Sequence, residues 1–158
     1  MTHNIEKNCC FTGHRDIPPD LLPEIRKNLE FELEKLYVLN GVKTFISGGA
    51  VGFDMIAAEM VVELKRRHPD VALIFALPCG DHSKKWSDSD ISKLRILSLY
   101  ADEVITLTPT YTRGCMHERN RFLVDNSLYC IAYCKKTSGG SYYTVNYAKK
   151  KNRTIIEI

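Results

Sequence analysis

Short apolar runs rich in β-branched residues alternate along this chain with longer segments whose apolar residues recur at helical spacing. Six strands are predicted by the runs NCCFTG, KTFISGG, VALIFALP, EVITLT, LYCIAYC and TIIEI. Five helices are predicted between them, at about residues 20–39, 52–68, 89–101, 115–127 and 142–151. Because parallel neighbours need helical crossovers, this order predicts an α/β fold: a three-layer, Rossmann-like, doubly wound and mostly parallel sheet.

The length and composition suit one domain, spanning residues 1–158, with 44% apolar and 26% charged residues. No apolar run approaches the roughly 18 residues of a membrane span, and the amino terminus does not read as a signal peptide. We therefore expect a cytoplasmic protein with no membrane partner. The six cysteines are expected to be reduced thiols, several of them acting as small core residues.

The charge balance is mildly basic, with 22 Lys and Arg against 19 acids and a net charge of +3. This favours small anionic ligands and argues against a nucleic-acid partner.

The glycines gather at one kind of position. Only Gly41 ends a helix, whereas eight of the nine follow a predicted strand and precede the next helix: Gly13, Gly48, Gly49, Gly52, Gly80, Gly114, Gly139 and Gly140. In a parallel sheet these turns lie at the carboxyl edge of the strands, where open α/β sheets bind ligands.

The first glycine turn, SGGAVGFD (residues 47–54), is a candidate phosphate site. Its backbone N–H groups, from Ser47, Gly48, Gly49, Ala50 and Gly52 onward, are expected to be unpaired and to point outward. Asp54 either caps those donors itself or binds a ribose hydroxyl. A turn without any ligand is the alternative, because the spacing is neither G-x-G-x-x-G nor that of a Walker A loop.

A second such turn, KKTSGGSYYT (residues 135–144), follows the fifth predicted strand. Ser141 is expected to cap the fifth helix, while Gly139 and Gly140 leave room for another anionic group. Two such turns on one edge suit a nucleotide or dinucleotide better than a lone phosphate.

Other polar residues are predicted at the same edge. His14 and Arg15 follow the first strand, and Arg15 suits a phosphate clamp. Asn120 interrupts an apolar helix face and needs a partner, whereas Arg121 and Asp125, four residues apart, are placed to pair. Trp86 and Tyr111 are candidates for stacking on a base. Because the spacings of Cys79, His82, Cys115 and His117 match no familiar zinc pattern, no metal site is predicted.

Four motifs together, TGHR, SGGAVGFD, RGCMHERNRFLVDNS and GGSYYT, resemble the SLOG superfamily, which includes the Smf/DprA proteins and the LOG hydrolases. The similarity covers nearly the whole chain and is greatest to the YpsA-like branch. It implies a sheet of order 3-2-1-4-5, extended by strand six, a homo-oligomer, and a nucleotide-derived ligand. The implied ligand residues are the glycine loop Gly48, Gly49, Gly52 with Asp54, together with Arg15, Arg119, Asn120 and the Gly139–Gly140 turn.

The chain departs from the LOG hydrolases, since SGGSYYTVNYA lacks the glutamate that serves their glycosidic cleavage. Asp54 is the obvious candidate catalytic carboxylate near the turns, and Glu118 and Asp81 are further candidates at the same edge. The leading interpretation is a non-catalytic sensor of a nucleotide or an NAD- or ADP-ribose-like molecule, without a certain cofactor. The alternatives are an N-glycosidase or phosphoribohydrolase-like enzyme acting on nucleoside phosphates, and a DprA-like nucleic-acid-binding module.

Overall fold

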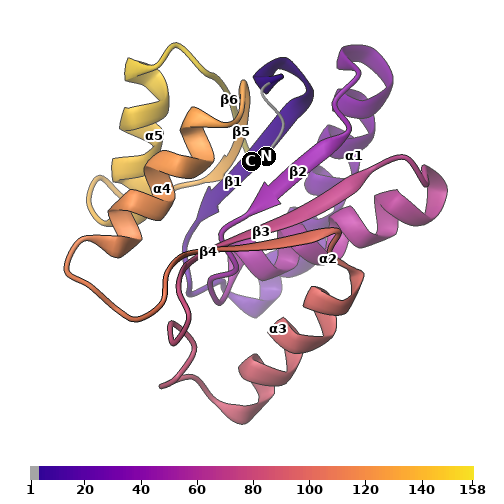
Figure 1. The fold of residues 1–158 in the computed structure, drawn as a ribbon. Helices are drawn as coiled ribbons and strands as arrows, with labels where there is room; N and C mark the ends of the chain where they lie inside the picture. The colour runs from indigo at the N-terminus through magenta and orange to yellow at the C-terminus, as the bar shows by residue number, and fades with distance from the viewer. Residues whose placement is uncertain (1–3) are drawn as a thin grey trace.

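One six-stranded sheet forms the centre of the molecule (Figure 1). In this computed structural model, which describes residues 4–158, the strands are β1 (Asn8–Gly13), β2 (Thr44–Ser47), β3 (Ala72–Cys79), β4 (Glu103–Thr108), β5 (Tyr129–Tyr133) and β6 (Thr154–Glu157). Every neighbouring pair is parallel. The predicted α/β, Rossmann-like fold is therefore confirmed.

The helices follow the predicted segments, with ends that differ from the expected ones by at most two residues. They are α1 (Leu22–Asn40), α2 (Phe53–Arg67), α3 (Asp88–Tyr100), α4 (Cys115–Asp125) and α5 (Gly140–Lys150), with short 3₁₀ turns η1 (Ile5–Lys7) and η2 (Pro19–Leu21). Gly41 ends α1 in the left-handed conformation, with φ of 67°, which is the usual role of a glycine after a helix. Within residues 4–158, no helix combines the length and apolar character needed to cross a membrane.

The strand order is β4-β3-β2-β1-β5-β6, so the predicted order 3-2-1-4-5 is wrong in the position of β4. Strand β4 lies at the edge beside β3, and β1 pairs directly with β5. The physical reason is exposure: β4 carries Glu103, Val104 and Thr106 on the surface, whereas β1 is buried from Asn8 to Thr12. A strand with that many exposed positions suits an edge and not the middle of a sheet covered on both faces.

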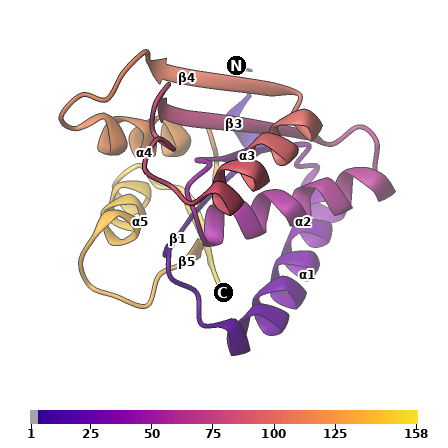
Figure 2. The same ribbon diagram turned by 90° about the horizontal axis from the view of Figure 1, so that it is seen from below.

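Helices cover both faces of the sheet. Figures 1 and 2 show α1, α2 and α3 on one side and α4 with α5 on the other. Successive strand residues alternate between the two layers: Phe45 packs in the larger core under α1–α3, and Ile46 in the smaller one that includes Leu123 of α4. The chain therefore turns to one face after β1 and to the other face after β5.

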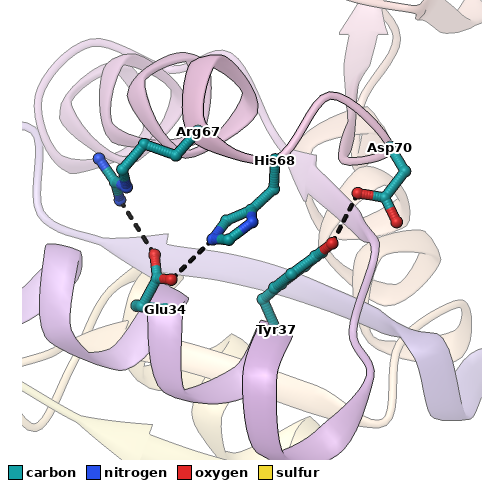
Figure 3. A network of polar contacts seen from close by, with 5 residues as sticks. All are labelled: Glu34, Tyr37, Arg67, His68 and Asp70. Atoms are coloured by element: carbon teal, nitrogen blue, oxygen red, sulfur yellow. Dashed lines mark hydrogen bonds and ion pairs between the residues drawn. The ribbon is translucent and has the colours of Figure 1, made fainter.

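A polar network joins α1 to the end of α2, near the amino end of β3 (Figure 3). Glu34 of α1 accepts from His68, with 2.6 Å between Oε1 and Nε2, and from Arg67 at 3.3 Å. Tyr37, whose ring stacks on His68, donates to Asp70 at 2.7 Å. Each charged group here has a partner within the network or in Lys43, which pairs with Asp70.

Candidate functional site

A cavity of about 300 Å³ opens at the carboxyl edge of the sheet, where β1 and β5 lie side by side. It is lined by the end of β1 with the loop after it, by α4, and by the turn that leads into α5. This is the point at which the chain direction over the sheet reverses, the usual location of a ligand in an open α/β sheet. We refer to it as the main cavity.

Ten of the predicted ligand residues line the main cavity: Gly13, His14, Arg15, Ala50, Asp54, Arg119, Asn120, Gly139, Gly140 and Ser141. The lining does not include Ser47, Gly48, Gly49 or Gly52, nor the candidate acid Glu118, which is exposed on α4. Sequence reasoning missed Phe11, Thr12, Asp16, Met116, Leu123, Lys136 and Ser138. Asp16, Lys136 and Ser138 lie within or beside the motifs that it did single out, so proximity to those turns was the available signal.

The first glycine turn is closed on itself. Gly49 N–H donates to Ser47 Oγ at 3.2 Å, and Ala50 N–H donates to Asp54 Oδ2 at 3.2 Å. Phe53 N–H, at the start of α2, donates to the carbonyl of His14 at 3.0 Å. The expectation that the donors of this turn are unpaired and point outward is therefore wrong for Gly49, Ala50 and Phe53. Asp54 caps one of them, which is one of the two roles that the sequence predicts for it.

Close packing explains the glycines of this region. A Cβ on Gly52, whose φ is 91°, would stand well inside 3.0 Å of the Arg15 backbone. A Cβ on Gly13 would meet the Phe53 ring just as closely. These two glycines let the end of β1 and the start of α2 touch, so their lack of a side chain positions the site.

Two buried opposite charges lie under the main cavity. Arg119 is 5% exposed and Asp54 is 7% exposed. Arg119 donates through Nη1 to the carbonyl of Gly48 and through Nε to Asn120 Oδ1, the latter at 2.9 Å. Asn120, which the sequence predicts to need a partner, thus has one. Arg119 also holds the first glycine turn in place.

Burial has the largest effect on the pKa values of Asp54 and Arg119. It raises the pKa of Asp54, and the charge of Arg119, the Ala50 N–H and the charge of Arg15 act in the opposite direction. Burial lowers the pKa of the Arg119 guanidinium, while Asp54 opposes that shift. An arginine remains charged in proteins, so Arg119 supplies the positive charge that Asp54 needs to ionise at this depth.

The second glycine turn is open. Helix α5 begins at Gly140 after Gly139, whose φ is 91°, and no side chain caps it. The prediction that Ser141 caps this helix is wrong, because the helix starts two residues earlier than expected, at Gly140, and places Ser141 inside its first turn. A Cβ on Gly139 would meet nothing within 4 Å. The first N–H groups of α5 have no intrahelical acceptor, and Gly139, Gly140 and Ser141 line the main cavity.

Two cations stand near that open turn. Arg15 and Lys136 both line the main cavity, and within residues 4–158 neither side chain makes a hydrogen bond or an ion pair. His14 lies beside them and accepts a hydrogen bond at Nε2 from the N–H of Lys135, at 2.7 Å. Burial and the charges of Lys136 and Lys135 lower the pKa of His14. An imidazole that accepts at Nε2 is neutral, so Arg15 and Lys136 carry the positive charge here.

The remaining candidates have other roles. Trp86 packs edge-on against His82, with 4.9 Å between ring centroids, and Tyr111 is exposed outside the main cavity. Instead of pairing with each other, Arg121 donates to the Tyr143 hydroxyl and Asp125 accepts from Tyr147.

Thiol and metal chemistry find little support in this region. Burial and a hydrogen bond with Asp81 raise the pKa of Cys79 to about 11, which leaves it a protonated thiol at neutral pH. Across residues 4–158, no group of three or more His, Cys, Asp or Glu side chains is placed to hold a metal ion.

Two solved structures share this fold. The chain superposes on DNA processing protein A from Helicobacter pylori, whose structure was described for its single-stranded DNA binding mode, with a TM-score of 0.69 and 20% identity. That superposition covers 98% of this chain and 66% of the other. DNA processing protein A from Streptococcus pneumoniae gives a TM-score of 0.71 at 16% identity, over 95% of this chain and 49% of the other.

Similar sequences and a family model show which protein family the chain belongs to. It is 29% identical to the SPbeta prophage-derived protein YoqJ of Bacillus subtilis, over 80% of this chain and 81% of YoqJ. It is 28% identical to a UPF0398 protein of Halalkalibacterium halodurans, over 82% of this chain and 69% of that protein. The YpsA model, described as the YspA SLOG family, matches residues 19–157. The chain thus belongs to the YspA SLOG family, the branch that its four sequence motifs resemble.

Proposed function

We propose that the main cavity binds a small phosphate-bearing ligand of the nucleotide class, and that the protein acts as a binding or sensor protein. One observation carries this proposal: the uncapped start of α5 at Gly139–Gly140 stands beside the unpaired cations Arg15 and Lys136. Helix N–H donors and cations on one cavity are the ordinary elements of a phosphate site.

The size of the cavity supports a small ligand. Ligand pockets range from about 300 to 1,000 Å³, and the main cavity, at about 300 Å³, lies at the lower end. Its lining also offers apolar contacts from Phe11, Met116 and Leu123, which suit a base or ribose next to the phosphate.

Binding is tested by the thermal unfolding of the protein with nucleoside mono-, di- and triphosphates, NAD and ADP-ribose. A ligand at 100 times its Kd stabilises the folded state by about 2.7 kcal/mol, which raises Tm by roughly 5–10 °C for a chain of this size. Lys136→Glu should weaken binding by at least about tenfold, because it removes one charge-assisted contact and adds repulsion. Lys84→Glu is the matched control: the same charge change, on an exposed residue outside the main cavity.

Single-stranded DNA is the second candidate, favoured by the fold shared with DNA processing protein A and by the exposed cations Arg15 and Lys136. An oligothymidine added to the same assay separates the two. Affinity for DNA should fall with salt in proportion to the phosphates contacted, whereas a nucleotide in a cavity should depend on salt weakly. A Tm unchanged by every nucleotide would reject the nucleotide proposal.

An enzyme acting on nucleoside phosphates would use Asp54 and Asp16, the two carboxyl side chains that line the main cavity. Release of free base from a bound nucleotide, lost in Asp16→Asn, would add this activity to the binding role.

A further inference from the structure

A second cavity, of about 210 Å³, lies on the other side of Arg15. It is bounded by the loop after β1 and by the first turns of α1, α2 and α3, whereas the main cavity faces α4 and α5. Figure 2 shows the loop after β1 running between these two groups of helices. Arg15 lines both cavities and is the residue they have in common.

The second cavity has apolar walls and a basic rim. Ile17, Leu22, Met55 and Ile56 supply the apolar surface. Arg26 and Lys93 supply the basic groups and share one carboxylate, that of Glu59, at 2.5 and 3.1 Å. Two cations on one acid leave a positive excess, which Asp90 offsets on one side and Arg15 adds to on the other. Such a cavity suits a ring that carries hydrogen-bond acceptors or an anionic group.

The backbone of Arg15 is held from both sides. Gly52 packs directly against it, and the neighbouring His14 carbonyl accepts from Phe53 N–H. On the other side, the His14 ring accepts from Lys135 N–H. The guanidinium itself has no hydrogen-bond partner among residues 4–158. The Arg15 guanidinium, on a fixed backbone and without a partner, lies between the two cavities. It is therefore free to bind a ligand that extends from one cavity into the other.

We propose that the second cavity is a second subsite for the same ligand, and that this ligand is a dinucleotide: two nucleosides joined through phosphates that lie on Arg15. This inference rests on the proposed function of the main cavity. A guanidinium can hold two oxygens of a phosphate group at once through its planar fork, which suits the linking phosphates. Each cavity alone is small for a drug-sized molecule, so a two-part ligand would use both.

The test compares two probes that differ only by the second half: AMP and diadenosine diphosphate. Their dissociation constants are measured by calorimetry on the wild-type protein, on Lys93→Glu and on Arg95→Glu. Lys93 lines the second cavity, whereas Arg95 is exposed on the same helix and lines neither cavity. We expect Lys93→Glu to weaken diadenosine diphosphate about tenfold while leaving AMP unchanged, and Arg95→Glu to leave both unchanged.

A second variant, Leu22→Trp, fills the same cavity without changing charge and should also weaken only the larger probe. Equal affinity of the wild-type protein for the two probes, or equal losses for both in Lys93→Glu, would reject the second subsite and leave the proposed function standing. Failure of the wild-type protein to bind either probe would reject the adenine-nucleotide form of the proposed function and this inference with it. Lys136→Glu, in the main cavity, should weaken both probes.

Discussion

The two glycine turns at the carboxyl edge look alike in sequence and differ in structure. In SGGAVGFD the N–H groups of Gly49 and Ala50 are bonded within the turn, and Arg119 takes the carbonyl of Gly48. In TSGGSYY the helix that follows is uncapped, a Cβ on Gly139 would meet nothing within 4 Å, and one on Gly140 would meet only Asn120 Nδ2, at 3.9 Å. The first turn is packed against neighbouring residues, whereas the second is exposed. A pair of glycines after a strand therefore marks a tight turn, and only the partners of its N–H groups decide whether a ligand fits.

The largest expected effect comes from removing the charge that holds the first turn. Arg119→Met leaves Asp54 buried without its neighbouring positive charge, and such a change typically costs about 3–5 kcal/mol. Urea unfolding at pH 7 measures the loss. Arg121→Met, on the same helix but partly exposed, is the control and should cost much less. A loss in Arg119→Met no greater than in this control would mean that the first turn does not depend on the buried charge.

The next largest effect is expected from adding a methyl group to each turn, which should destabilise the first turn more than the second. Gly52→Ala combines a left-handed φ with overlap on the Arg15 backbone, so we expect a loss of about 2–4 kcal/mol. Gly139→Ala carries a left-handed φ of the same size but meets no atoms, so about 1–2 kcal/mol is expected. The free energies of unfolding of the two variants give the comparison directly. Equal losses would contradict the view that only the first turn is packed.

The smallest effect concerns pH and the second turn. Since the folded-state pKa of His14 is lowered, its neutral form stabilises the fold fully above the usual value of 6.5, and this contribution is lost as pH falls below 6.5. His14→Gln keeps an acceptor for the Lys135 N–H without titrating. The stability advantage of the wild-type protein over this variant should therefore shrink between pH 7.5 and pH 5.5. An advantage that does not change with pH would show that His14 has no such role.

Much of this architecture was predictable from sequence, for identifiable reasons. Apolar runs such as VALIFALP, buried on both faces in β3, and the spacing of Leu29, Leu33 and Leu36 in α1 are local signals, and both elements form as expected. The strand order was not predicted correctly, because it came from a resemblance and not from the residues. The polar positions Glu103 and Thr106 in EVITLT already indicated an edge strand.

The site was predicted less completely than the fold. Gly139, Gly140 and Arg15 line the main cavity, as their positions after strands indicated. Gly49 and Gly52 do not, because a hydrogen bond from Arg119 and packing against Arg15, both distant in the chain, decide where this turn faces. The ion pair of Lys93 with Glu59 joins α3 to α2, and the second cavity lies between three helices, so no local pattern marked it.

The direct pairing of β1 with β5 has a consequence for how the protein is made. On the ribosome, β1 is made long before β5, the neighbour that begins at Tyr129, and Lys136 to Ser141 follow later still. A nascent chain that stops before residue 136 can form neither the open turn nor the main cavity. Binding of the proposed ligand would therefore stabilise only chains whose translation has passed that point, and shorter nascent chains would gain nothing from it.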